Sequence, residues 1–364
     1  MARRRRAAET IEPIEVVGGV DTHKDSHTAA VVDLAGRLLG TEQFAATGAG
    51  YQRLLDWLGG FGMVVKVGIE GTGAYGAGLA RHLAAAGIEL VEIDRPDRKA
   101  RRWQGKSDPV DAEAAARAAL AGRRTGVPKD RTGQVEALRA LRVARRGGVD
   151  HRADVIKQMK ALIVTAPEAL RAELAALANA QLVMVCAEAG IDAAKAGDPV
   201  VAIRLALRSL AHRYQHLSAE IKELDTVIDR LLTTIAPRLL EVHGVGPDVA
   251  GQLLVSVGDN PERLRSEAAF AMLCGVAPLP ASSGRTNRHR LNRGGDRQAN
   301  RALYTVVLTR LRWDPATRAY VERRTAEGKS KKEIIRCLKR YVARELYTIL
   351  LACGGSAAPT AVAA

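Results

Sequence analysis

Hydrophobic and polar positions alternate with two different periods over the first 130 residues. A period of two, or a short continuous apolar run, predicts a β-strand, and a period near 3.6 predicts a helix. On this basis we expect strands in a hairpin at 16–33 and at 38–45, 63–70 and 88–93, and helices at 51–58, at 75–86 and from Asp108. Three strands followed by alternating helices and strands predict an α/β region with a mixed central sheet.

Helical patterns fill the middle of the chain. We expect a long basic helix at 134–165. We also expect a second helix in which apolar residues recur from Leu217 to Ile235 at alternating intervals of four and three residues and form an apolar seam along one face. This seam is typical of helix pairing, either between subunits or within an intramolecular hairpin. The seam stops at Pro237, and glycines flank Val245 shortly afterwards. That turn favours either a helix-hairpin-helix, whose amides hold phosphate, or an ordinary turn between helices.

The last third predicts a helix at 268–279 that runs into a proline-rich bend, a basic segment, a helix through Arg312 and a basic helix at 331–351. The expected organisation is a disordered basic arm at 1–13, an α/β domain at 14–130, a helical coiled-coil region at 131–236, a mainly α C-terminal domain at 237–352 and a flexible tail at 353–364.

The amino-acid composition gives the chain a strong positive charge, which indicates the kind of partner it binds. The chain has 55 Lys and Arg against 40 Asp and Glu, a net charge of +15 and a pI near 10.0. Such a charge favours a polyanion, most commonly nucleic acid, with an anionic membrane surface as the competing partner. No apolar run is long enough to cross a bilayer, and the basic start lacks the apolar core of a signal peptide. Four scattered cysteines without a CxxC pair fit a reducing cytoplasm.

Four acidic residues lie where chemistry could use them. Asp21 ends the first predicted strand, Glu70 ends the fourth, and Asp108 and Asp111 lie three apart at the start of a helix. Each has an ordinary alternative: a turn aspartate, a strand-end glutamate, or helix acids that complement the dipole. Taken together they match a site that holds two divalent cations for phosphoryl transfer, and hard oxygen ligands favour Mg²⁺. This arrangement predicts an RNase H/RuvC-like domain.

A second candidate is the serine segment, Ser282-Ser283-Gly284, which lies among basic residues. A serine there could act as a nucleophile only with a base and a stabilised leaving group. The alternative is a loop whose arginines only position DNA. The expected phosphate-binding residues are Arg285, Arg288, Arg290, Arg293, Arg297 and Arg301.

Six motifs occur in one order along the chain: DTHKD, IEGTGAYG, KSDPVDAEAAARAA, GVGPDVAGQLL, AAFAMLCGVAPLPASSG and RGGDRQANRALY. Together they resemble the IS110 (IS-one-ten) family of insertion-sequence transposases, over residues 16–351. The resemblance implies a RuvC-like DEDD domain, a coiled-coil middle and a C-terminal transposase domain with a catalytic serine. By motif position, the acidic quartet is Asp21, Glu70, Asp108 and Asp111. The serine is Ser283, with Ser282 as the fallback.

The resemblance also implies a reaction and its partners. The enzyme would recombine double-stranded donor and target DNA under the guidance of a structured bridge RNA, through a covalent phosphoserine link and a Mg²⁺-dependent acidic site. Dimers would pair into a tetramer in the bacterial cytoplasm, at the nucleoid. Two alternatives stay open: a RuvC-like metal-dependent nuclease that hydrolyses branched DNA with water, and a nucleic-acid-binding structural protein with an inactive RNase H-like domain. Covalent protein–DNA adducts would separate the recombinase from both.

Overall fold

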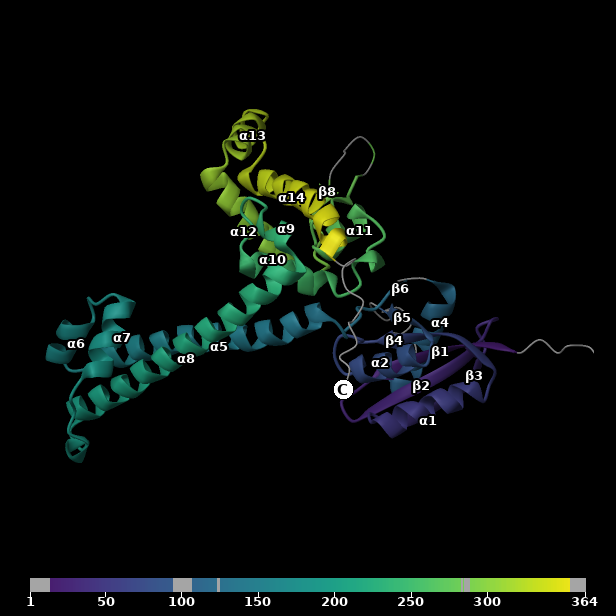
Figure 1. The fold of residues 1–364 in the computed structure, drawn as a ribbon, viewed down its shortest axis with the longest axis horizontal. Helices are drawn as coiled ribbons and strands as arrows, with labels where there is room; N and C mark the ends of the chain where they lie inside the picture. The colour runs from purple at the N-terminus through teal and green to yellow at the C-terminus, as the bar shows by residue number, and fades with distance from the viewer. Residues whose placement is uncertain (1–13, 94–106, 123–124, 283, 285–288, 354–364) are drawn as a thin grey trace, which may run out of the picture. The chain divides into compact units, whose positions relative to one another are not determined.

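The computed structural model describes residues 14–93, 107–122, 125–282, 284 and 289–353 (Figure 1). The chain divides into two compact units, residues 1–131 and 132–364. The expected basic arm at 1–13 and the expected tail beyond Cys353 lie outside the described residues, as do residues 94–106.

The first unit is built on a six-stranded mixed sheet in the order β3-β2-β1-β4-β5-β6 (Figure 1). The strands are β1 (Glu15–Thr22), β2 (Ser26–Asp33), β3 (Leu38–Ala45), β4 (Met63–Glu70), β5 (Glu89–Ile93) and β6 (Thr125–Gly126). β1 runs antiparallel to β2 and parallel to β4, which runs parallel to β5. The predicted α/β layout is confirmed. Only β6 was not predicted, because two residues carry no periodic signal.

Helices cover both faces of this sheet. They are α1 (Gly48–Gly59), α2 (Ala77–Ala85) and α4 (Asp108–Ala121). Val16 and Val20 of β1 pack in one core with leucines of α1 and α2. Val17 packs in another core with alanines of α4. This division follows from the strand period, because successive side chains point to opposite faces.

His27 on β2 is an unusual member of the α1 side of the sheet. Its side chain is 0 % exposed and stacks on Tyr51 with ring centroids 5.6 Å apart, and neither ring nitrogen has a hydrogen-bond partner among the described residues. A buried polar group without a partner costs about 1–3 kcal/mol. Burial also lowers the pKa of His27.

We expect His27→Phe to stabilise the first unit by about 1–2 kcal/mol, because the ring stays and the unpaired nitrogens go. The unfolded chain protonates this histidine near a pKa of about 6.5, whereas the folded chain resists the proton. The free energy of unfolding should therefore fall as pH drops below about 6.5 in the wild type, and less steeply in the variant. Urea unfolding at pH 7.5 and 5.5 measures both effects, and equal pH dependence of the two proteins would contradict the assignment.

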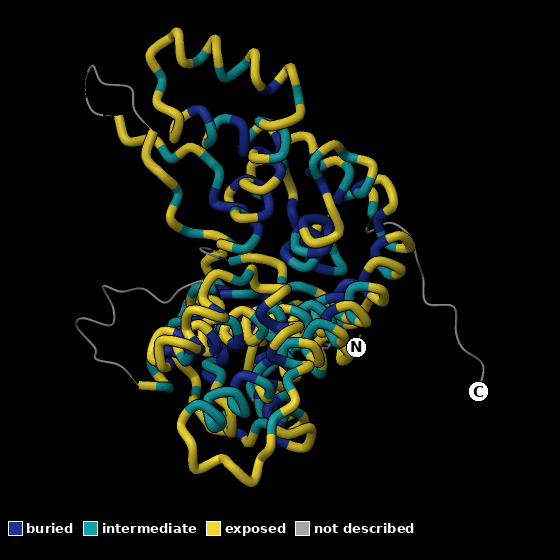
Figure 2. The backbone as a smooth tube through the Cα atoms, turned by 90° about the vertical axis from the view of Figure 1, so that its left-hand side faces the viewer, coloured by how far each residue is buried: buried dark blue, intermediate teal, exposed yellow. Residues whose placement is uncertain are grey.

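The second unit begins with a long helical hairpin of α5 (Gln134–Val164) and α8 (Pro199–Ile235). Arg152 of α5 donates to the Ser218 hydroxyl of α8 at 3.3 Å, and Gly148 lets Ile221 approach the α5 backbone. Ile221 and Ile228 of the predicted seam are buried, and exposed positions alternate with buried ones along the helices (Figure 2). The seam therefore pairs helices within one chain, which was the intramolecular alternative. At the far end, α6 (Glu168–Leu174) and α7 (Asn179–Glu188) share a core with the hairpin.

Six further helices then surround a separate apolar core. They are α9 (Pro237–Leu240), α10 (Pro247–Val257), α11 (Glu267–Leu273), α12 (Arg297–Trp313), α13 (Pro315–Ala326) and α14 (Lys331–Cys353). Gly244, with φ of +86°, turns the chain between α9 and α10, so the predicted pair of helices around Val245 is confirmed. Phosphate binding by that turn stays a prediction. None of these or the other described helices has both the length and the apolar character needed to span a bilayer.

The helix expected at 268–279 is shorter in the structure. α11 ends at Leu273 because Gly275, with φ of +64°, turns the chain against the Gly294 carbonyl. Leu279–Pro280 forms strand β7 instead, paired with β8 (His289–Arg290). α13 was not predicted as a separate helix. It begins at Pro315 because Asp314 accepts a hydrogen bond from the Thr317 amide and ends the run of α12.

Candidate active site at the end of the sheet

Two glycines bring α4 unusually close to the sheet. A Cβ atom at Gly19 of β1 would lie 2.1 Å from the Ala116 amide nitrogen, and one at Gly68 of β4 would lie 2.8 Å from the Ala115 carbonyl oxygen. Positions 19 and 68 therefore face α4. Because side chains alternate along a strand, Asp21 and Glu70, each two residues further on, lie on the same face.

Three side chains converge at this end of β1. The His23 Nε2 atom lies 3.4 Å from Asp21 Oδ2 and 3.3 Å from Asp108 Oδ1. One ligand atom from each of the three residues falls within 4.8 Å of the other two. The Asp21 side chain is 13 % exposed and that of Asp108 is 43 % exposed, so the cluster opens to solvent on the helix side.

Asp111 adds a third carboxylate from the first turn of α4, and it is 3 % exposed. Burial raises the pKa of Asp21; the His23 ring counteracts this, and the charges of Asp111 and Asp108 raise the pKa further. The positive end of the α4 dipole favours acids in this turn but is worth only about 0.3–1 kcal/mol. Three acids so close together therefore favour a bound cation.

Glu70 lies beside Asp21 in the sheet, since Val20 pairs with Ile69 one residue earlier. The Thr22 hydroxyl donates to the Glu70 carbonyl oxygen at 2.8 Å and so ties the two strand ends together. Gly71 follows with φ of +76°, which permits the sharp turn away from the strand. Glu70 does not belong to the cluster of Asp21, His23 and Asp108. Its backbone nevertheless lies at the same edge of the sheet, where the Thr22 hydroxyl bonds to it.

The side chains fit a divalent metal ion. Carboxylate oxygens are the ligands that Mg²⁺ and Mn²⁺ prefer, and imidazole nitrogen is a further donor for Mn²⁺ and softer ions. Asp21 and Asp108 could hold such an ion, with Asp111 and Glu70 at the same edge to complete its oxygen ligands or bind a second ion. A cation there would also offset both the burial and the repulsion by Asp111 and Asp108 that raise the pKa of Asp21.

Sequence reasoning missed His23 as a member of the site. His23 stands two residues after Asp21 in DTHKD, and that spacing puts both side chains on one side of an extended segment. The spacing was the available signal. Ser107 occupies the N-cap position of α4, and its side chain makes no capping hydrogen bond with the described residues. Only its carbonyl contributes, by accepting from the Asp111 amide at 3.0 Å.

We expect Gly19→Ala to damage both the fold and the site, because the new methyl group would displace α4 and the acids in its first turn. Overpacking of this kind costs about 1–3 kcal/mol. Gly59→Ala is the matched control, since a Cβ there meets nothing within 4 Å. Thermal unfolding and a Mg²⁺ titration measure the effect. Wild-type stability and metal affinity in Gly19→Ala would contradict the close packing.

The serine segment belongs to the second unit. Ser283, Arg285 and Arg288 lie outside the described residues, whereas Ser282 and Gly284 are described and exposed. The remaining predicted phosphate-binding residues are all exposed: Arg290, Arg293, Arg297 and Arg301. They lie in β8, in the following turn and on the first turns of α12.

A hydrogen-bond network fixes the base of this segment. The Asn300 amide of α12 donates to the Cys274 carbonyl at 2.8 Å and accepts from the buried Lys339 ammonium at 2.9 Å. Asp296 caps α12 and accepts from the Ser256 hydroxyl at 2.6 Å. The exposed arginines therefore stand on a rigid support.

Comparison with known proteins agrees with these two regions. Residues 18–166 match a family model described as a transposase and named for DEDD and IS110, and residues 236–322 match one described as the transposase IS116/IS110/IS902 family. The chain is 34 % identical over 146 residues to an uncharacterized 43.6 kDa protein of insertion element IS110 from Streptomyces coelicolor, covering 39 % of this chain and 36 % of that protein. It is 27 % identical over 249 residues to an uncharacterized 42 kDa protein of insertion element IS900 from Mycobacterium paratuberculosis, covering 64 % and 62 %.

Each alignment therefore spans less than two thirds of the relative. The two family models match in the order in which the acidic site and the serine segment occur along the chain. Two separate parts of the chain, residues 18–166 and 236–322, therefore match transposase families of the IS116/IS110/IS902 type.

Proposed function

We propose that the chain is a transposase that recombines DNA by metal-dependent phosphoryl transfer at the acidic site. The convergence of Asp21, His23 and Asp108 at the end of the sheet carries this proposal. Support comes from the DEDD transposase match over the same residues and from the net charge of +15. The mixed sheet with α4 across it is consistent with an RNase H/RuvC-like domain, which is part of the proposal.

In this mechanism Asp21, Asp108, Asp111 and Glu70 would hold one or two Mg²⁺ ions. Bound there, such an ion would neutralise charge on the phosphoryl group and lower the pKa of a bound nucleophile. The side chains of the site would position the scissile phosphate at the solvent-exposed side of the cluster, where Asp108 and His23 are accessible, while Asp21 and Asp111 lie deeper. His23 can hydrogen-bond either neighbouring carboxylate and so orient it.

We further propose that Ser283, with Ser282 as the alternative, forms a transient covalent link to DNA. The serine oxygen attacks a DNA phosphorus, the bond to one strand's hydroxyl oxygen breaks, and that hydroxyl leaves with a proton. The hydroxyl of the incoming strand then attacks the phosphoserine and releases the serine. The described arginines support this role, because Arg290, Arg293 and Arg297 can pair with phosphate close to the serine segment.

The finer parts of the proposal rest on the resemblance between motifs. The partners would be donor and target DNA and a bridge RNA, and the assembly a dimer that pairs into a tetramer. In that assembly the serine of one subunit would meet the acidic site of another, in the cytoplasm at the nucleoid. The direct test is recombination of donor and target plasmids by the purified chain with and without the element's own RNA. Product formation without that RNA, or equally with an unrelated RNA, would contradict guidance.

Binding of nucleic acid should depend steeply on salt, because each phosphate neutralised by Lys or Arg releases counterions. We expect the logarithm of the association constant for the element's RNA to fall linearly with the logarithm of salt concentration. Arg293→Ala should reduce the slope by about 0.7–0.9, the contribution of one phosphate contact. Fluorescence anisotropy from 50 to 400 mM salt, roughly the range over which phosphate contacts weaken, measures both. A flat response would contradict the assignment.

A RuvC-like nuclease that hydrolyses branched DNA is the second candidate. The acidic site favours it equally, because that site alone is sufficient for attack by water. This candidate leaves the serine segment and its arginines without a role. A covalent protein–DNA adduct distinguishes the two.

A further inference from the structure

Two tyrosines meet on the surface of the second unit, where α13 packs against α14 (Figure 1). The rings of Tyr320 and Tyr341 are in edge-to-face contact, with centroids 5.7 Å apart and planes at 87°. Tyr341 is 51 % exposed, so much of its ring faces solvent. A single exposed ring is common on protein surfaces, so the groups that surround this pair of rings decide what it could bind.

Arginines surround these rings. The guanidinium carbon of Arg323 lies 5.4 Å and that of Arg324 5.8 Å from the centre of the Tyr320 ring, and that of Arg344 lies 6.0 Å from the centre of the Tyr341 ring. We call Tyr320, Tyr341, Arg323, Arg324 and Arg344 the tyrosine patch. Stacking on a ring holds a guanidinium in place and leaves its N–H groups free for an anion.

Acidic side chains pair with only some of the arginines in the tyrosine patch. Arg324 pairs with Glu327 at 2.5 Å, and Arg344 reaches Glu267 only at 3.8 Å. Arg323 is exposed and has no acidic partner among the described residues. Residues 315–353 contain ten Lys and Arg against four Asp and Glu. This excess of positive charge favours an anionic partner.

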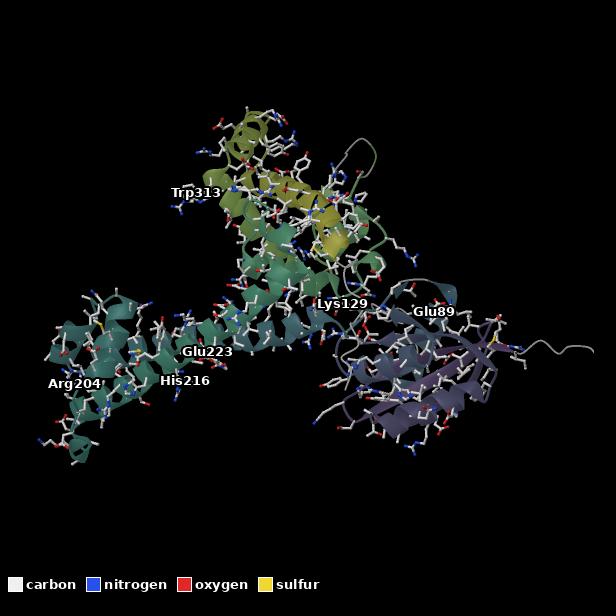
Figure 3. The ribbon with its side chains drawn as sticks, in the orientation of Figure 1. Glu89, Lys129, Arg204, His216, Glu223 and Trp313 are labelled. Carbon is white, nitrogen blue, oxygen red and sulfur yellow. The ribbon has the colours of Figure 1, made fainter. Side chains whose placement is uncertain are left out.

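The combination of aromatic rings and arginines in the tyrosine patch distinguishes between two kinds of anionic partner, duplex and single-stranded nucleic acid. A duplex presents phosphates but hides the faces of its bases, so arginines alone would serve it. Unpaired nucleotides present both a phosphate chain and open base faces, which aromatic side chains bind by stacking. A similar pair occurs at the end of α12, where Arg312 stacks on Trp313 at 4.9 Å and Trp313 is 63 % exposed (Figure 3).

We propose that the tyrosine patch binds unpaired nucleotides of a single-stranded RNA or DNA segment, with a base stacked on Tyr341 and phosphates held by Arg323 and Arg344. The site is distinct from the arginines that flank the serine segment. It deepens the proposed function by adding an element that distinguishes single strands from duplex, and it rests on that function only for the presence of nucleic acid.

The test compares three proteins with labelled 15-nucleotide oligothymidylate and oligouridylate (about one site size of a single-strand-binding domain) and with a duplex of equal length. Loss of one stacked base weakens binding by roughly tenfold. Tyr341→Ala should therefore bind both single strands about tenfold more weakly and bind the duplex within about twofold of the wild type. Tyr341→Phe keeps the ring and should bind all probes like the wild type. A difference between the two single strands would assign the site to RNA or to DNA.

Two results would overturn the proposal. One is unchanged single-strand binding by Tyr341→Ala. The other is equal weakening for single strand and duplex, which indicates general damage or simple charge effects. Because these measurements need no recombination, their failure leaves the proposed function intact. Conversely, the patch stands if single-strand binding depends on Tyr341 in a chain that fails to recombine DNA.

Discussion

Ser283→Ala is expected to abolish the covalent protein–DNA complex and reduce recombination at least about a thousandfold, because in the proposed mechanism the Ser283 hydroxyl supplies the attacking oxygen. Binding of RNA and DNA should stay within about twofold, since the hydroxyl is lost only from the reacting centre. The nearby arginines would stabilise charge on the phosphoryl group in the transition state, and that stabilisation has no effect without a nucleophile. A plasmid recombination assay and an electrophoretic mobility assay on the same preparations measure the two effects.

Ser282→Ala is the matched control, since it removes a hydroxyl one residue away. It should keep appreciable recombination. If Ser282→Ala is inactive while Ser283→Ala recombines DNA, the nucleophile is Ser282 and our register is wrong by one. If both variants recombine DNA, the phosphoserine mechanism itself is wrong for this chain.

Asp21→Asn is expected to stop strand exchange while the first unit stays folded. The substitution keeps the size of the side chain and removes the charge that would bind the cation, a charge whose burial and neighbouring aspartates raise the pKa of Asp21. A metal ion contributes several kcal/mol to phosphoryl transfer, so the expected loss is at least about a thousandfold. Thermal stability should be unchanged or higher, because the variant buries one charge fewer.

Asp25→Asn is the control for this substitution, because Asp25 is exposed in the same turn and lies outside the acidic cluster. It should retain activity. Calorimetry with Mg²⁺ and Mn²⁺ on the double variant Asp21→Asn/Asp111→Asn tests the ligand assignment separately from the reaction. Metal binding equal to that of the wild type would show that these carboxylates are not the ligands.

Much of the first unit could be predicted from the sequence, because its elements have strong local signals. The run 63–70 is apolar and bounded by glycines, and β4 has those bounds. Asp108 starts α4 as predicted, since Pro109 suits the first turn of a helix. The placement of acids at strand and helix ends followed from the same signals.

Other features depend on contacts between distant residues and leave no local signal. The close packing of α4 on Gly19 and Gly68 shows only when helix and sheet are together. The bridging position of His23 needs Asp108 as well as Asp21. The end of α11 is set by Gly275 meeting Gly294, nineteen residues further on. A heptad seam alone does not state whether its partner lies in the same chain, and here α5 supplies that partner.

The covalent intermediate is the most direct test of the recombinase assignment. The purified chain would be incubated with donor and target DNA, the element's RNA and Mg²⁺, digested with nuclease and protease, and analysed by mass spectrometry of the peptide that contains Ser282 and Ser283. We predict a nucleotide adduct on Ser283 that is absent without DNA. Recombinant DNA formed with no nucleotide on either serine at any time during the reaction would contradict the account.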